Sequence, residues 1–199
     1  PPLTEAEENL IAKSMGQVDE MKAKAPRVAG SANDTVEKFM HRTGEGAAWA
    51  MSVAKMDISA VDLFTELWLL DTYELKAENK HMAIREVFKD LDGTRGIQYC
   101  RSMALPGGFQ GRLFEVWMTW KKLIDGDGRL SFIIAITPLA FYPGTRHAVA
   151  GAEKFQEATS RGVIICKVLT ENTCEWTRAQ QFDLKINLHS KITNFLAKQ

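Results

Sequence analysis

The sequence predicts an α+β fold with an antiparallel sheet, and three observations lead to that prediction. Residues 96–121 contain two runs of alternating side chains on either side of Pro106-Gly107-Gly108, which is the pattern of paired strands. More short alternating runs follow, too close together in sequence for the crossover helices that parallel strands need. Helical spacing is confined to three segments, at the start, the middle and the end of the chain.

Local signals set the expected boundaries of these elements. Thr4 and Glu7 form a capping box for a first helix, which Ala25-Pro26 ends, and Ser59 caps a second helix in SAVDLFTELWLL. We expect residues 1–33 to pack as a helix and linker on a domain formed by residues 34–199. The other segments are strands at 36–42, 48–58, 81–91, 97–104, 113–121, 129–137, 163–169 and 174–184, a turn at 44–46, a loop at 142–153, and a last amphipathic helix at 188–199.

The composition narrows the class of protein. The 199 residues include 25 basic and 25 acidic side chains and carry no net charge, which argues against a nucleic-acid partner. No apolar run approaches the roughly 20 residues that span a bilayer, and no signal peptide heads the chain. Three cysteines without motif spacing predict reduced thiols and a cytoplasmic location.

Metal and cofactor chemistry has little support in the sequence. The DGDG stretch at 125–128 imitates part of a calcium loop, but Leu123 and Ile134 stand where that loop needs acidic ligands. The stretch therefore predicts a hairpin turn. No metal or cofactor is expected, because the histidines show no metal-ligand spacing; they are His41, His81, His147 and His189.

Four short segments together resemble a known family. Trp49 sits early in the strand ahead of Ser59, and LPGGFQGRLF at 105–114 is similar to a Pro-rich loop that runs into Arg-Asp-Phe. The segments AVAG at 148–151 with RGV at 161–163, and FDLK at 182–185, are similar to later motifs of the same family. In order and spacing they resemble the START (steroidogenic acute regulatory protein-related lipid transfer) domain. Met118 departs from the family, since some sterol-binding members carry a cavity Arg there.

This resemblance implies a helix-grip fold, a curved antiparallel sheet wrapped around the C-terminal helix with an internal cavity. The loop at 106–111 would form part of the entrance. The cavity would hold one sterol, phospholipid or fatty-acid-like lipid without a covalent step, and transfer would leave room for transient contact with a membrane surface. The protein would act as a monomer or as part of a longer chain. The residues expected to line the cavity are Tyr99, Arg101, Met103, Phe114, Val116, Met118, Trp120, Phe132, Ile134, Ile136, Ile164, Cys166, Val168, Trp176, Arg178, Ile192, Phe195 and Leu196.

Other interpretations remain open. The apolar face could pack as solid core, which would make the chain a regulatory or interaction module without lipid cargo. A helix-grip cyclase would need an inward acid and base, whereas Glu115 alternates outward. Arg101 would either anchor a carboxylate, phosphate or hydroxyl of the ligand, pair with an inward acid, or be turned outward by a bulge. Arg178 and Gln180 offer a second polar position.

Overall fold

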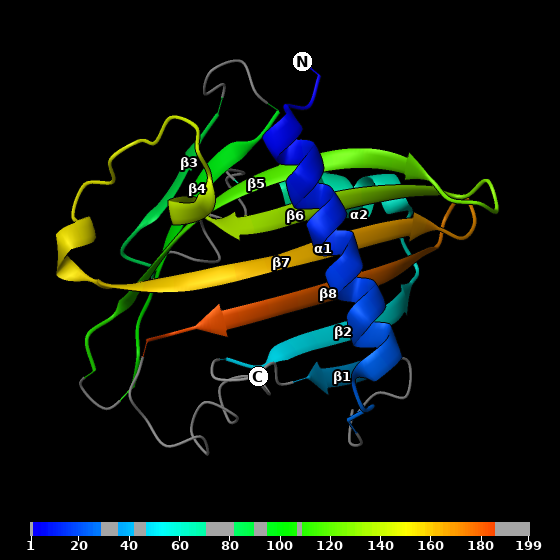
Figure 1. The fold of residues 1–199 in the computed structure, drawn as a ribbon, viewed down its shortest axis with the longest axis horizontal. Helices are drawn as coiled ribbons and strands as arrows, with labels where there is room; N and C mark the ends of the chain where they lie inside the picture. The colour runs from blue at the N-terminus through cyan, green and yellow to red at the C-terminus, as the bar shows by residue number, and fades with distance from the viewer. Residues whose placement is uncertain are drawn as a thin grey trace.

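In the described part of the chain, an eight-stranded sheet carries α1 (Glu5–Lys24) on one face and α2 (Ala60–Trp68) on the other (Figure 1). The computed structural model describes residues 2–28, 36–41, 47–70, 82–89, 95–106 and 109–185. The elements are α1 (Glu5–Lys24), β1 (Val36–His41), β2 (Trp49–Met56), α2 (Ala60–Trp68), β3 (Arg85–Phe88), β4 (Ile97–Met103), β5 (Arg112–Ile124), β6 (Leu130–Pro138), the 3-10 turns η2 (Leu139–Phe141) and η3 (Ala152–Lys154), β7 (Gln156–Val168) and β8 (Cys174–Asp183).

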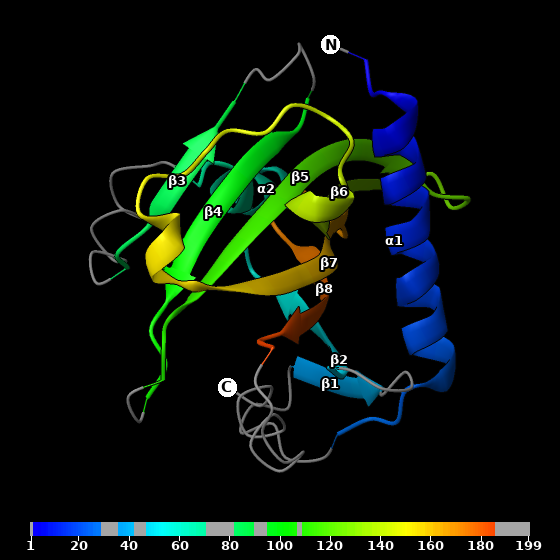
Figure 2. The ribbon, with the colours of Figure 1, turned by 60° about the vertical axis from the view of Figure 1, so that its left-hand side comes forward.

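The strand order is β1-β2-β8-β7-β6-β5-β4-β3, with antiparallel neighbours throughout. The sheet is curved, as the turned view in Figure 2 shows. One parallel pairing is added where β6 has ended: β7 lies directly beside β5 from Arg112↔Gln156 to Phe114↔Ala158. At that end of the sheet, only β5 and β7 therefore separate β4 from β8.

α1 covers the face of the sheet that we call the outer face. Its predicted capping box is present, because the Thr4 hydroxyl accepts from Glu7 N–H at 3.3 Å and the Glu7 carboxylate accepts from Thr4 N–H at 2.9 Å. The helix ends at Lys24, just before Pro26, as a proline requires. Its side chains Ile11, Val18 and Met21 are buried against the sheet. They form an outer-face cluster with the sheet residues Trp49, Met51, Ile133, Ala135, Val163 and Ala179.

α2 covers part of the opposite face, which we call the inner face. Ser59 caps this helix, since its hydroxyl accepts from Asp62 N–H at 3.1 Å. Leu63 and Phe64 are buried against the sheet, while Asp62 and Glu66 are exposed. The helix is amphipathic, as its sequence predicted.

Two predicted strand boundaries were wrong. β7 begins at Gln156 and not at residue 163. Its first half has few apolar side chains but pairs through its backbone with β5 and then β8. β3 is limited to Arg85–Phe88, shorter than the expected 81–91, because its partner β4 begins only at Ile97 and the pairing ends at Phe88↔Gln98.

The hairpin turn predicted at 125–128 is confirmed. Asp125 N–H donates to Arg129 O at 3.0 Å, and the Asp125 carboxylate accepts from the backbone N–H groups of Asp127 and Arg129. The predicted turn at 44–46, the tip of the 106–111 loop and the helix at 188–199 lie outside the described residues.

Candidate binding site on the inner face of the sheet

Strand register brings most of the predicted site residues to one face. Tyr99 lies opposite Val116, and Met118 lies opposite both Ile97 and Ile136. Directly opposite residues of an antiparallel pair point to the same side, so these pairings extend one row across the sheet. The predicted residues on the inner face are Tyr99, Arg101, Met103, Phe114, Val116, Met118, Trp120, Phe132, Ile134, Ile136, Ile164, Cys166, Val168, Trp176 and Arg178. Ile192, Phe195 and Leu196 lie outside the described part of the chain.

One end of this face is packed by α2. The Phe64 ring lies 5.0 Å from the Phe132 ring and 5.0 Å from the Trp120 ring, measured between centroids. Trp68 lies edge-on to Trp120 at 6.4 Å. These contacts make the Trp120 and Phe132 end of the face an ordinary helix–sheet core.

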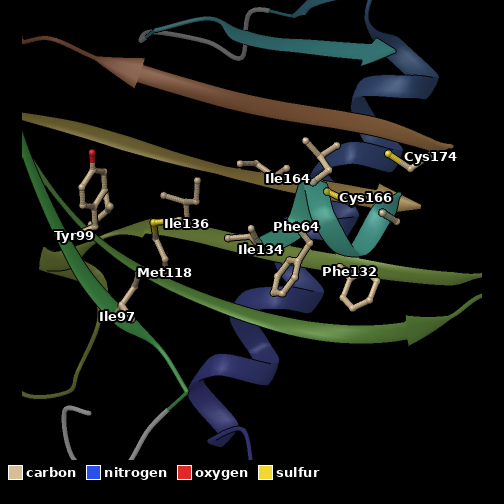
Figure 3. Packing of buried hydrophobic residues seen from close by; sticks show 13 residues of the cluster. Phe64, Ile97, Tyr99, Met118, Phe132, Ile134, Ile136, Ile164, Cys166 and Cys174 are labelled. Atoms are coloured by element: carbon tan, nitrogen blue, oxygen red, sulfur yellow. The ribbon is translucent and has the colours of Figure 1, made fainter. Parts of the chain in front are cut away.

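A second apolar region lies further along the same strands. Figure 3 shows Tyr99, Ile97, Met118 and Ile136 on β4, β5 and β6, to one side of α2. They are buried side chains, with Met118 only 4% exposed. Flexible and aromatic side chains of this kind suit contact with an irregular apolar ligand.

Arg101 adds a positive charge to this apolar surface. It lies partly buried over two aromatic rings, 5.4 Å from the Phe114 centroid and 5.9 Å from the Phe182 centroid. Desolvation lowers the pKa of its guanidinium, and the positive charge of Arg85 adds to the lowering. Its inward placement removes the bulge alternative, and no ion pair to Arg101 occurs among the described residues.

Arg178 also faces inward and is held by neutral partners. Its Nε donates to Gln180 Oε1 at 2.8 Å, its Nη2 donates to the same oxygen, and Gln180 Nε2 donates to Ser160 Oγ at 2.8 Å. Burial lowers the pKa of Arg178, with a further contribution from the charge of Arg101. The second polar position expected at Arg178 and Gln180 is thus a connected hydrogen-bond network.

Sequence reasoning missed four inner-face residues at this polar end. One is Arg112, which lies opposite Met103 and donates to Leu184 O at 2.6 Å. Arg85 lies opposite Arg101, donates to Leu70 O at 2.9 Å and lies over the Tyr99 ring. Ser160 and Phe182 lie opposite each other on β7 and β8. Phe182 could have been found by continuing the alternation from Arg178 and Gln180. Ser160 lies ahead of the predicted start of its strand, and Arg85 lies within the predicted strand 81–91, but its face depends on its register with β4.

The acid considered for a catalytic role lies on the other face. Glu115 is on the outer face, where the Cys100 thiol donates to its Oε1 at 3.8 Å. Burial raises the pKa of Cys100 to about 12 and also raises the pKa of Glu115. His147 also lies at the outer face. Its backbone N–H donates to Gln98 Oε1, and its ring stacks on the Phe88 ring with 4.7 Å between centroids.

Within the described residues, no group of three or more His, Cys, Asp or Glu side chains could hold a metal ion. The three cysteines are free and buried. No helix in this part of the chain is long and apolar enough to cross a membrane.

A curved antiparallel sheet with helices on its two faces defines an α+β protein of the helix-grip class. No protein-family model and no curated protein sequence matches the chain. Solved START structures do match. Human StAR-related lipid transfer protein 5 has a TM-score of 0.68 at 13% identity, over 96% of this chain and 88% of that chain.

Two further human structures give the same result. STARD10 has a TM-score of 0.66 at 14% identity, over 94% of this chain and 72% of that chain. The lipid transfer and protein localization domain of StarD13 (DLC2) has a TM-score of 0.59 at 14% identity, over 99% of this chain and 93% of that chain. The chain therefore has a START-like fold, which confirms the fold that the sequence motifs predicted.

Proposed function

We propose that this chain binds one lipid molecule, non-covalently, against the inner face of its sheet. The observation that carries the proposal is the apolar region beyond α2, where Tyr99, Val116, Met118 and Ile136 face the same side. Its similarity in fold to proteins described as lipid transfer proteins supports the same function. Burying an acyl chain contributes about 0.8 kcal/mol per CH₂ group, so retention of a lipid needs no chemistry.

A non-catalytic role fits the placement of the titratable groups. The inner face presents guanidinium, amide, hydroxyl and phenol groups, whereas Glu115 is on the outer face. General acid–base catalysis needs an acid and a base within reach of one bound molecule. Binding, with or without transfer, is therefore the function that these residues support best.

The test compares lipid content between matched variants. Val116→Trp places an indole on the inner face, and Val61→Trp makes the same change at an α2 position that is 52% exposed. Each purified protein is extracted with organic solvent and the lipids are quantified by mass spectrometry. We expect close to one lipid per chain in the wild type and in Val61→Trp, and a large loss in Val116→Trp with unchanged circular dichroism.

The competing interpretation is an interaction module whose inner face is filled by its own side chains. It predicts no bound lipid in the wild type and no rise in melting temperature after addition of a total lipid extract from the expression host. That pair of results would reject lipid binding. Equal lipid content in Val116→Trp and the wild type would reject the inner face as its location.

A further inference from the structure

Two arginines on strands far apart in the sheet, Arg101 on β4 and Arg178 on β8, both face inward, and their positive charges interact. Arg101 extends from β4 over Phe114 on β5 and Phe182 on β8, with its guanidinium carbon 5.4 Å and 5.9 Å from the two ring centroids. Phe182 and Arg178 lie on the same face of β8. Arg101 reaches Phe182 at the end of the sheet where β6 has stopped and β7 pairs with β5, whereas the Arg178 backbone lies in the row of Ile164 and Ile134.

Neither guanidinium has an acidic partner within the described residues. Arg178 donates to the amide oxygen of Gln180, which is neutral, and Arg101 rests on aromatic rings. The ion pairs of this part of the chain involve other residues. A guanidinium stays charged in proteins. Arg101 and Arg178, like Arg85 and Arg112 in the same inward register, therefore carry positive charges that no carboxylate of the described residues pairs with.

The distribution of acidic residues strengthens this point. Every Asp and Glu in the eight described strands falls in the outward register, so the strands bring no carboxylate to the inner face. These residues are Glu37, Glu86, Glu115, Glu157, Glu175 and Asp183. Burying a charge without a partner is unfavourable, and an anionic ligand would supply the missing partner.

The two ends of the inner face differ in chemistry. Its α2 end is aromatic, with Phe64 between Trp120 and Phe132, and its opposite end holds Arg101 over Phe114. Phe114 and Trp120 are six residues apart on β5, and at about 3.3 Å per residue this is about 20 Å. One leaflet of a bilayer core, half of roughly 30 Å, is of similar size, so the span of the face matches the length of an acyl chain.

We propose that the inner face selects a lipid whose apolar tail extends toward α2 and whose anionic group, a carboxylate or a phosphate, lies between Arg101 and Arg178. The proposal rests on the lipid-binding function above and adds the charge of the ligand. A planar guanidinium binds carboxylate and phosphate oxygens through two parallel hydrogen bonds. Gln180 and Ser160 would hold Arg178 in position for that contact.

The experiment uses three ligands with the same acyl chain. Oleate, 1-oleoyl lysophosphatidate and the uncharged 1-monooleoylglycerol are titrated into the delipidated full chain, and binding is measured by calorimetry. We expect one of the anionic ligands to bind about tenfold or more tightly than monooleoylglycerol, since a charged hydrogen bond contributes that much. The preference between oleate and lysophosphatidate shows whether the group is a carboxylate or a phosphate.

Variants assign the effect to the arginines. Arg101→Gln and Arg178→Gln should each weaken the preferred anion about tenfold or more and leave monooleoylglycerol unchanged, while Arg101→Lys should retain part of the affinity. Arg161→Gln is the matched control, because Arg161 is an exposed outer-face arginine on β7. Melting temperatures of the delipidated variants show whether each one folds.

The outcomes separate this proposal from the function on which it depends. Equal binding of all three ligands, or equal losses for charged and uncharged ligands in the glutamine variants, would overturn the anion proposal and leave lipid binding intact. No binding of any ligand by the wild type would overturn both.

Discussion

The Glu7 carboxylate, in the first turn of α1, accepts a hydrogen bond of 3.1 Å from the Thr119 hydroxyl on β5, 112 residues later in the chain. The other carboxylate oxygen of Glu7 accepts from both the N–H and the hydroxyl of Thr4. Glu7 is fully buried. One side chain thus completes the helix cap and joins the N-terminal helix to the outer face of the sheet.

We predict that Thr119→Val destabilises the protein by about 1–3 kcal/mol, because it leaves a buried carboxylate oxygen without its donor. Glu7→Ala should cost more, since it also removes the capping box. Urea unfolding of the two single variants and the double variant measures the coupling. Strictly additive effects would mean that this hydrogen bond contributes nothing to stability.

The raised pKa of Glu115 predicts a pH-dependent contribution to stability. Burial, with the nearby charge of Glu157, raises the pKa of Glu115 in the folded protein above its ordinary value. The folded state therefore binds this proton more tightly than the unfolded state, and stability falls as pH rises from the ordinary carboxyl pKa to the raised one. Glu115→Gln should remove this dependence, so the variant gains stability relative to the wild type as pH rises above the ordinary carboxyl pKa.

The pKa of Asp125 is shifted in the opposite direction to that of Glu115, so its contribution to stability changes with pH in the opposite sense. The Lys167 ammonium, 2.5 Å away, and backbone N–H groups hold the pKa of Asp125 below its ordinary value. Its contribution is present above the ordinary carboxyl pKa and is lost as pH falls through the lowered one. Asp125→Asn should therefore lose stability relative to the wild type as pH rises from 3 to 5. Urea unfolding across this pH series checks both variants, and curves parallel to the wild type would contradict the assignment.

Gly162 on β7 is required by close approach of the neighbouring strand. A Cβ at this position would lie 2.5 Å from the backbone oxygen of Ala179 and 3.1 Å from Gln180 Cγ. We predict that Gly162→Ala costs about 1–3 kcal/mol, as for overpacking in a core. Gly126→Ala, with nothing within 4 Å of the added carbon, is the control and should be near neutral. Thermal unfolding compares them, and equal melting temperatures would show that the sheet adjusts without cost.

Alternation of apolar and polar residues predicted correctly those strands that have one apolar and one more polar face. Alternation placed Phe114, Val116 and Met118 on one face, and the register agrees, since Val116 lies across from Tyr99 and Met118 across from Ile97 and Ile136. Alternation failed at the start of β7, where the strand is made by backbone pairing, first with β5 and then with β8, and not by a pattern of side-chain polarity.

The site was predictable in part. The inward direction of Arg101 follows from its place in a regular strand, two residues from Tyr99. Two other features could not be predicted, because they depend on how separate elements align. One is the packing of α2 on Trp120, and the other is that no described strand places an acidic side chain on the inner face. Local pattern fixes the face of a residue, whereas its neighbours are set by strand register.

Pairing of β2 with β8 makes completion of the sheet depend on the order of synthesis. Residues 49–56 acquire their second neighbour only when residues 174–181 have been made. Contacts so distant in sequence slow folding, and open strand edges favour aggregation before they are paired. A chain interrupted ahead of Cys174 would leave both β2 and β7 with an unpaired edge. Such products should collect in the insoluble fraction of an expressing cell.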